Sequence, residues 1–222
     1  MNDKMEILAA EEEEKKSQIT ETPPAETLPA ETAEQTMNLA GNIKLMQNLY
    51  KTAKLYASSS MIPQNYQGRP DNCFVALELA GRMGVSPTLV MQNLIVVQGR
   101  PSWSGQGCIA LINGCGKFTH DLDFVMVGSL EEDNRGCFCR AVRKSDGKEL
   151  IGTTITIDLA KKEGWFDKKG SKWQTMPEQM LMYRAASFFA RTYCPEVLMG
   201  FSTADEVEDI TDVQSEKVRI TM

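Results

Sequence analysis

The chain has 222 residues, 42% of them hydrophobic, and a formal net charge of −6 at neutral pH. This length can bury the core of one domain of ordinary size. No run of about 18 apolar residues occurs, so we expect no membrane span, and the acidic N-terminus lacks the pattern of a secretory signal. Six cysteines without CxxC spacing and one histidine, His120, favour the reduced thiols of a cytoplasmic protein over a zinc site.

The charge is unevenly distributed along the chain. Residues 1–36 contain ten acidic and three basic residues, and residues 203–222 contain six acidic and two basic ones. Residues 37–202 contain 19 basic and 14 acidic residues and are therefore net basic. The overall acidity hides a basic body between acidic ends, and we expect these ends to limit the binding of nucleic acid or to mimic it between subunits.

The first 36 residues lack the material of a core. The stretch TETPPAETLPAETAEQT has an imperfect PAET repeat, three prolines and no aromatic residue. Such a segment buries too little apolar surface to offset its ordering entropy. We therefore predict a disordered acidic tail over residues 1–36, a folded domain over 37–202 and an acidic C-terminal segment over 203–222 that begins as a short helix.

The predicted elements of the domain begin with helices. Apolar residues recur every three or four positions over residues 37–57, which indicates an amphipathic helix. A second helix covers residues 71–83, and Gly84 is placed to end it. Ser86 and Pro87 are the N-cap and first-turn residues of a third, short helix.

Strands and two further helices follow. The sequence NLIVVQGRPSWS predicts a hairpin that turns at Gln98 and Gly99. Cys137 and Cys139 lie two apart in an alternating strand, so they face the same side of a sheet. The fold class is therefore α+β, with N-terminal helices, a β-hairpin, an antiparallel β-meander and a long C-terminal helix. The remaining predicted elements are a helix over 106–113, strands over 120–127, 137–143 and 149–157, and the helix over 177–193.

Catalytic signatures are weak. The chain has no GxxxxGK[ST] phosphate loop and no GxSxG motif, and a single histidine leaves little for a nucleophile–histidine pair. Asp121 and Asp123 alternate and could hold Mg²⁺ in a nuclease, or they could simply form the solvent face of a half-exposed sheet. We expect a binding protein, not an enzyme, without a cofactor or a metal.

Residues 161–173, KKEGWFDKKGSKW, contain five lysines and two of the three tryptophans. Ammonium groups neutralise phosphates and ring faces stack on unpaired bases, so this composition favours single-stranded nucleic acid. Arg184 and Arg191 lie seven apart on the last helix and could extend the cationic surface. The alternative is that Trp165 and Phe166 are core residues and the lysines belong to a solvated loop.

Two segments resemble the RecT family of phage single-strand annealing proteins. They are FVALELAGRMGVSPTLVMQNLIVVQGRPSWSGQGCIALINGCGKF and AKKEGWFDKKGSKWQTMPEQMLMYRAASFFARTYCPEVLMGFSTADEVEDI. The resemblance spans roughly Met37 to Ile210 and makes residues 37–202 the annealing and DNA-binding domain. It implies a recombinase that works without ATP, coats single-stranded DNA and pairs it with a complementary strand in homologous recombination. A passive single-strand-coating protein is the alternative.

The resemblance also implies partners and site residues. The expected partners are single-stranded DNA, the annealed duplex, further copies of the chain in a ring or helical filament, a phage exonuclease and the host's single-strand-binding protein, in the cytoplasm of a bacterial host. Helix 37–57 and the hairpin around Gly99 could form subunit contacts or pack within the chain. By resemblance to the family's basic groove, the DNA-binding role is assigned to Lys161, Lys162, Lys168, Lys169, Lys172, Arg184 and Arg191, with Trp165 and Trp173 stacking on bases or shaping the groove, and Arg100 and Trp103 as further candidates.

Overall fold

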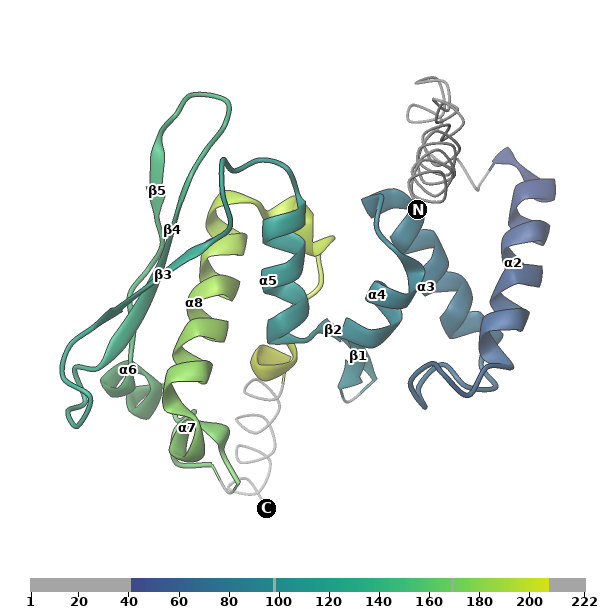
Figure 1. Cartoon of the computed structure of the whole chain (residues 1–222). Coiled ribbons are helices and arrows are strands. Elements are labelled where there is room, and N and C mark those ends of the chain that lie inside the picture. The colour runs from purple at the N-terminus through teal and green to yellow at the C-terminus, as the bar shows by residue number, and fades with distance from the viewer. Residues whose placement is uncertain (1–40, 98, 169, 208–222) are drawn as a thin grey trace, which may run out of the picture. The chain divides into compact units, whose positions relative to one another are not determined.

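The computed structural model describes residues 41–97, 99–168 and 170–207, so the predicted tail over 1–36 and most of the acidic segment over 203–222 lie outside the described residues. The chain divides into two units, Met1–Asn38 and Leu39–Met222. The second unit combines helices with antiparallel sheets, which confirms the α+β class (Figure 1). Its elements are α2 (Ile43–Ala57), α3 (Pro70–Met83), α4 (Pro87–Asn93), β1 (Leu94–Val97), β2 (Arg100–Trp103), α5 (Gly105–Gly114), β3 (Asp123–Val127), β4 (Gly136–Val142), β5 (Glu149–Ile151), β6 (Ile155–Thr156), α6 (Ile157–Lys162), α7 (Lys172–Thr175), α8 (Pro177–Tyr193) and the 3-10 helix η3 (Pro195–Leu198).

Helices α2 and α3 pack through small side chains. Ala53 and Ala57 are the buried residues of α2, and Cys73, Ala76 and Ala80 are among those of α3. Small side chains let the two helix backbones approach closely. Gly84 ends α3 in the left-handed conformation, at φ 64°, as its position predicted.

The first turns of α2 do not face the core. The helix begins at Ile43, where the Asn42 side chain caps it by accepting a hydrogen bond from the Leu45 amide at 3.0 Å. Ile43 is 75% exposed and Met46 is 41% exposed, although the periodicity placed both on the apolar face. The apolar stripe of α2 is therefore wider than the surface that α3 covers.

The predicted hairpin is formed by β1 and β2. Val97 pairs with Arg100, so two residues make the turn, and Gly99 has φ 80°, which a side chain would strain. At the other end of β2, Trp103 is fully buried, and its indole Nε1 donates to the Leu198 carbonyl at 3.1 Å. The hairpin is thus joined to a segment that lies almost a hundred residues later in the chain.

The larger sheet has the strand order β3–β4–β5, with β6 also paired to β4. Cys137 and Cys139 are both fully buried, so they face one side of the sheet as predicted. The third predicted strand, 149–157, is split into β5 and β6. Gly152 is the first residue after β5: its amide donates to the Cys139 carbonyl at 2.7 Å, and a Cβ there would lie 3.2 Å from the Phe189 ring.

Helix α8 lies between the larger sheet and α5 (Figure 1), and it has the predicted bounds, 177–193. Leu181 and Ala185 are fully buried, whereas Thr192, seven positions after Ala185 and so on nearly the same side of the helix, is exposed. Burial extends to Ala186 and Phe189 because elements cover the helix on two sides. A stripe prediction assumes one covered side, so it underestimates the buried surface of this helix.

Two short helices were not predicted, because the sequence after residue 157 suggested a loop. The Thr156 side chain caps α6 by accepting a hydrogen bond from the Leu159 amide at 3.1 Å. Lysines occupy the last turn, where their positive charge interacts favourably with the negative end of the helix dipole. Ser171 is the N-cap of α7. The lysine-rich stretch is therefore partly helical at both ends.

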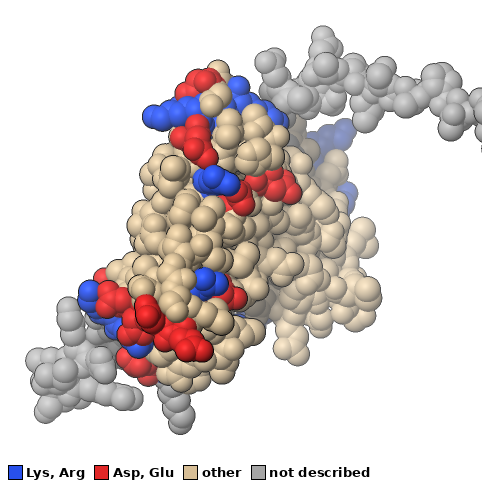
Figure 2. Space-filling model, turned by 60° about the vertical axis from the view of Figure 1, so that its left-hand side comes forward, with Lys and Arg blue, Asp and Glu red and all other residues tan. Residues whose placement is uncertain are grey.

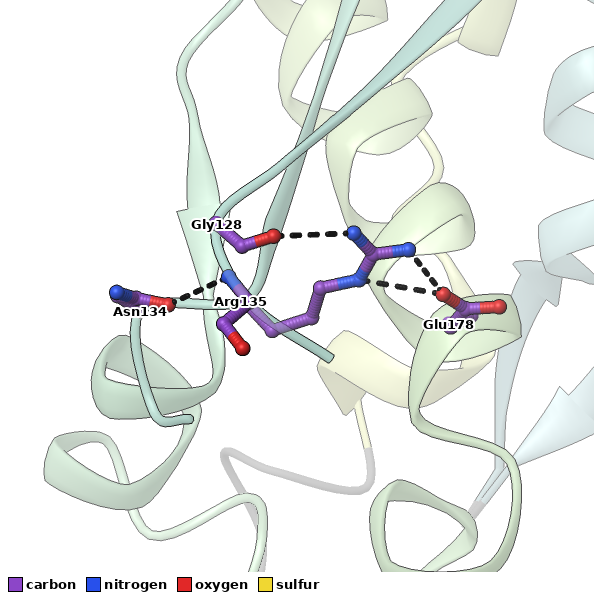
Figure 3. Close-up of polar contacts among 5 residues, drawn as sticks. Gly128, Asn134, Arg135 and Glu178 are labelled. Carbon is purple, nitrogen blue, oxygen red and sulfur yellow. Dashed lines mark hydrogen bonds and ion pairs between the residues drawn. The ribbon is translucent and has the colours of Figure 1, made fainter. Parts of the chain in front are cut away.

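A single arginine joins the β3–β4 turn to the start of α8 (Figure 3). The Arg135 guanidinium donates to the Gly128 carbonyl at 3.3 Å and forms an ion pair with Glu178 in the first turn of α8. Next to it, the amide of Ser129 donates to the Asn134 side chain at 2.9 Å. These contacts attach the far end of the sheet to the helix that also carries the site described below.

In the part of the chain that the structure describes, no single helix is long and apolar enough to cross a membrane. Helices α3 and α4 together reach the length and composition of a span, but they are bent by 119° relative to each other.

Cysteine reactivity tests the packing of the core. Five of the six thiols are buried and Cys115 is partly exposed. Burial raises the pKa of Cys108 and of Cys194 to about 12 and that of Cys137 to about 11, so at pH 8 these groups stay protonated and unreactive. We expect iodoacetamide at pH 8 to modify Cys115 first in the folded protein and all six thiols in urea, as measured by peptide mass spectrometry. Equal rates in the folded protein would contradict this packing.

Candidate nucleic-acid interface

A cavity of about 670 Å³ lies beside α8 and contains part of the lysine–tryptophan stretch. Its walls come from β1, the first turn of α5, residues 165–173, the first half of α8 and the short helix that begins after Thr203. We call it the α8 groove. Of the residues assigned from sequence, it brings together Trp165, Lys168, Lys172, Trp173 and Arg184.

The charged side chains of the α8 groove are mainly cationic. Lys168, Lys172 and Arg184 line it, against one carboxylate, Asp205. Lys172 is exposed at the start of α7, whereas Arg184 is only 4% exposed. The groove therefore combines a solvated ammonium with a guanidinium in a less hydrated setting, where its field is screened less.

The two tryptophans of the stretch form a wall of this groove. Trp165 is 8% exposed and Trp173 is 3% exposed, and their ring centroids are 5.7 Å apart with a tilt of 31°. The Arg184 guanidinium lies 3.9 Å from the Trp165 ring centroid, which is a cation–π contact that fixes the arginine in place. Rings this buried have almost no face left for a base, so their position supports the groove-shaping alternative over stacking.

The backbone around Trp165 is held by hydrogen bonds. The Ser171 hydroxyl donates to the Trp165 carbonyl at 2.8 Å, and the Gln174 side chain donates to the Phe166 carbonyl at 2.9 Å. Ser171 also caps α7 through its contact with the Trp173 amide. The loop that carries the lysines is therefore held in place by hydrogen bonds and is not freely solvated.

The first turn of α5 was not predicted as part of the site. Ser104, Gly105 and Gln106 line the groove, so the positive end of the α5 dipole lies at its wall and favours anions such as phosphate. A Cβ at Gly105 would lie 2.5 Å from the Tyr183 ring, so only glycine lets α5 approach α8 this closely. The signal in the sequence is the serine N-cap followed by glycines in SWSGQG.

Two assigned lysines lie on α6 and make ion pairs. Lys161 contacts Asp133 at 2.7 Å, and Lys162 contacts Asp158 at 2.7 Å. Neither lines the α8 groove. Figure 2 shows a matching pattern: on the face brought forward from the sheet side, cationic and acidic side chains lie intermixed at two ends around an uncharged middle. This face has no continuous cationic stripe.

The hairpin candidates are also separate from the α8 groove. Arg100 is exposed at the start of β2, and the Trp103 ring is fully buried against Phe201. Trp103 therefore serves the core in this structure. Lys169 lies outside the described residues, so its position is not assigned.

Arg191 does not line the groove but contacts a buried carboxylate. Its guanidinium forms an ion pair with Glu206, which is 5% exposed. The same carboxylate accepts hydrogen bonds from the Ser187 hydroxyl and from the Thr203 amide. The last contact is one of the two bonds of a capping box in a TxxE sequence, and a short helix starts after Thr203. We call the segment 198–207 the C-terminal latch, because Glu206 and the bond from Trp103 hold it on the domain.

The acidic pair considered for a nuclease does not form a metal cluster. Asp123 accepts a hydrogen bond from Arg140 at 2.7 Å, and Arg140 also lies 3.7 Å from Glu149. Within residues 41–97, 99–168 and 170–207, no group of three or more metal-ligating side chains is found.

Removing the buried carboxylate tests the latch. The change Glu206→Ala leaves the Ser187 hydroxyl, the Thr203 amide and part of Arg191 without their acceptor, and we expect it to lower the free energy of unfolding by about 2 kcal/mol. Glu163→Ala, at an exposed position, is the control and should change it by less than about 0.5 kcal/mol. Urea denaturation followed by circular dichroism measures both. Equal stabilities of the two variants would show that the network does not hold the latch.

Comparison with known proteins identifies a matching protein family. The model of the RecT family matches residues 55–218, which is most of the chain and includes every residue of the α8 groove. Neither the curated proteins nor the solved structures give a significant match. The family match confirms the resemblance seen in the two sequence segments: the chain belongs to the RecT family, whose members bind DNA and anneal complementary single strands in recombination.

Proposed function

We propose that the α8 groove binds the phosphate backbone of single-stranded DNA, and that the protein anneals complementary strands without ATP in phage-type recombination. The observation that carries the proposal is the set of three cations, Lys168, Lys172 and Arg184, beside the α5 N-terminus, all within the span that matches the family. The passive coating protein remains the alternative that the experiment below distinguishes.

The chemistry of the groove suits a strand held by its backbone. Cations and a helix N-terminus attract phosphates whatever the base sequence, because they make no contact that distinguishes bases. The Trp165 ring positions Arg184, and both tryptophan rings are too buried to contact base edges. Base edges that stay free can pair with a second strand, so the protein has only to reduce phosphate repulsion and align the strands.

No nucleotide hydrolysis is needed for this step. Pairing of complementary strands is downhill in free energy, and the barrier lies in bringing two polyanions together. Neutralising phosphates with groove cations lowers that barrier and releases counterions, so binding should weaken as salt rises. This accounts for a recombination protein whose sequence has no phosphate loop.

Pairing kinetics test the proposal directly. Two complementary labelled oligonucleotides are mixed with the protein, without ATP or metal, and pairing is followed by fluorescence. We expect the protein to accelerate pairing, and the variant Lys168→Ala/Lys172→Ala to lose most of the acceleration because two cations that line the groove are removed. The plot of log affinity against log salt has a negative slope. Its magnitude should decrease by roughly 0.7 for each phosphate that the variant no longer neutralises.

The matched control is Lys144→Ala/Lys148→Ala. It removes the same charge from two exposed lysines near the β4–β5 turn, and neither of them lines the groove. If both double variants lose activity equally, net charge and not the groove governs binding. Tight binding without acceleration by the unmodified protein would leave a coating protein.

Oligomerisation is the second part of the proposal, since one groove can hold only a short piece of strand. We propose that the exposed side of α2 contacts a neighbouring copy, because Ile43, Met46 and Tyr50 recur at helical spacing and are 75%, 41% and 41% exposed. The hairpin around Gly99 is the other predicted contact, and Val96 there is 44% exposed.

Sedimentation velocity tests which surface is used. The variant Ile43→Ser/Met46→Ser should shift the protein to smaller species with little change in stability, because both side chains are exposed in the single chain. Leu130→Ser, at a 70% exposed position on the β3–β4 turn, should leave the assembly unchanged. If the α2 variant assembles as before and Val96→Ser forms smaller species, the hairpin and not α2 makes the subunit contact.

The proposed protein partners, a phage exonuclease and the host's single-strand-binding protein, and the bacterial cytoplasm as the place of action rest on the family alone. Co-sedimentation of the purified proteins tests each partner, and absence of a complex would remove it.

A further inference from the structure

The α8 groove has an apolar wall as well as cations. Besides the two tryptophans, Ile95, Met176, Met180 and Tyr183 line the same cavity as the three cationic side chains. Phosphates gain nothing from apolar side chains, so binding of a backbone alone leaves this wall without a ligand. A ligand that suits the whole groove has an apolar part next to an anionic one.

Three of these side chains lie on one side of the start of α8. Met176, Met180 and Tyr183 are spaced by four and then three residues, and the Met180 amide donates to the Met176 carbonyl at 3.1 Å. Met180 is buried, but Tyr183 is only partly buried and Met176 is 48% exposed. Lys172 lies four positions before this run and Arg184 follows it, so a cation stands at each end.

The Tyr183 ring is fixed by the backbone of α5. A Cβ at Gly105 would lie 2.5 Å from Cγ and 2.7 Å from Cδ2 of this ring, so the glycine backbone covers part of it. The ring is only partly buried and lines the cavity, so its remaining surface is open to the groove. A ring that is already held in place loses little conformational freedom when a ligand contacts it.

A nucleotide with an unpaired base has parts that suit both walls of the groove. Its phosphate is an anion for the lysines and the α5 N-terminus, and its base is a flat ring that stacks on an aromatic side chain. Trp165 and Trp173 are too buried to serve as that side chain, whereas Tyr183 is not. In a duplex each base is already stacked between its neighbours, and freeing a face costs unstacking energy.

We propose that Tyr183 stacks on one base of the bound single strand, with Met176 and Ile95 beside it, and that this contact makes the groove prefer single strands to duplex. The inference rests on the proposed function, because the cations that bind the phosphates bring the base to the ring. A contact with the base face leaves the pairing edge free for the complementary strand. Pairing restacks the base on its neighbours, so the annealed duplex keeps only the phosphate contacts and is bound less tightly.

An abasic strand separates the base contact from the phosphate contacts. Labelled oligo-dT and an abasic oligonucleotide of the same length carry the same phosphates, and fluorescence anisotropy gives Kd for each. We expect the unmodified protein to bind oligo-dT about five- to tenfold more tightly than the abasic strand. Tyr183→Leu keeps an apolar side chain beside Gly105 but removes the ring, so it should bring the two Kd values to within about twofold of each other. Tyr183→Phe keeps the ring and should retain the preference.

The matched control is Phe188→Leu. It removes a partly buried aromatic ring from the same helix, at a position that does not line the groove, and it should retain the preference for oligo-dT. A preference that survives in Tyr183→Leu, or that is lost equally in Phe188→Leu, would overturn the proposal. Equal weakening of both strands by Tyr183→Leu would also overturn it, since the tyrosine would then only support the packing of α5 on α8.

Photocross-linking tests the contact in the unmodified protein. An oligonucleotide with 5-iododeoxyuridine forms bonds under ultraviolet light with aromatic side chains that lie against its base. Trypsin releases residues 173–184 as one peptide, WQTMPEQMLMYR, and tandem mass spectrometry identifies the linked residue. We expect the link on Tyr183. Links found only on peptides that do not line the groove would overturn the proposal.

The outcomes separate this inference from the proposed function on which it rests. If neither oligo-dT nor the abasic strand binds, the proposed DNA role of the groove is refuted, and the base contact with it. If both strands bind with equal Kd and salt weakens both, the groove binds phosphates and the base contact alone is refuted. A duplex that binds as tightly as oligo-dT would likewise refute only the preference for single strands.

Discussion

The structure depends on the burial of α8 between the larger sheet and α5. Leu181, Ala185, Phe189 and Ala190 are completely inaccessible, and the helix packs on both β4 and α5. Covering a helix on two sides leaves few positions for charged side chains, because an unpaired buried charge costs several kcal/mol. The one buried arginine of this helix, Arg184, is stacked on Trp165 and lies at the groove. The position of the groove follows from this packing.

Local sequence patterns predicted much of the fold. They failed where contacts between distant residues determine the local structure. The hairpin follows from alternation and a Gln–Gly turn, and the bounds of α8 follow from Pro177 and its apolar periodicity. The predicted strand 149–157 is interrupted after Ile151, where Gly152 lies close to Phe189, 37 positions away, a contact that no local pattern contains. Helix α6 had usable signals, a threonine cap and an acid in the first turn, but the lysine-rich composition after them suggested a loop.

The sequence predicted the kind of side chains at the candidate site, but only some of the residues that form it. Composition identified the cationic residue types, but it could not say which cations already have partners. Lys162 pairs with Asp158 four positions earlier, a spacing that a helix prediction would have revealed. Lys161 and Arg191 pair with acids 28 and 15 positions away, which only the fold brings near. The burial of Trp165 and Trp173 likewise arises from packing, since lysine-flanked tryptophans suit a surface and a core equally well.

The bond from Trp103 to the carbonyl of Leu198 joins positions separated by 95 residues, and the groove likewise takes one wall from residues 95–106 and the other from residues 165–205. Contacts of such long sequence separation form late, because the chain between them must be ordered first. A nascent chain on the ribosome therefore has neither a closed core nor a complete groove until nearly all of it has been synthesised and released from the exit tunnel. The proposed binding surface is therefore incomplete while the chain is being made.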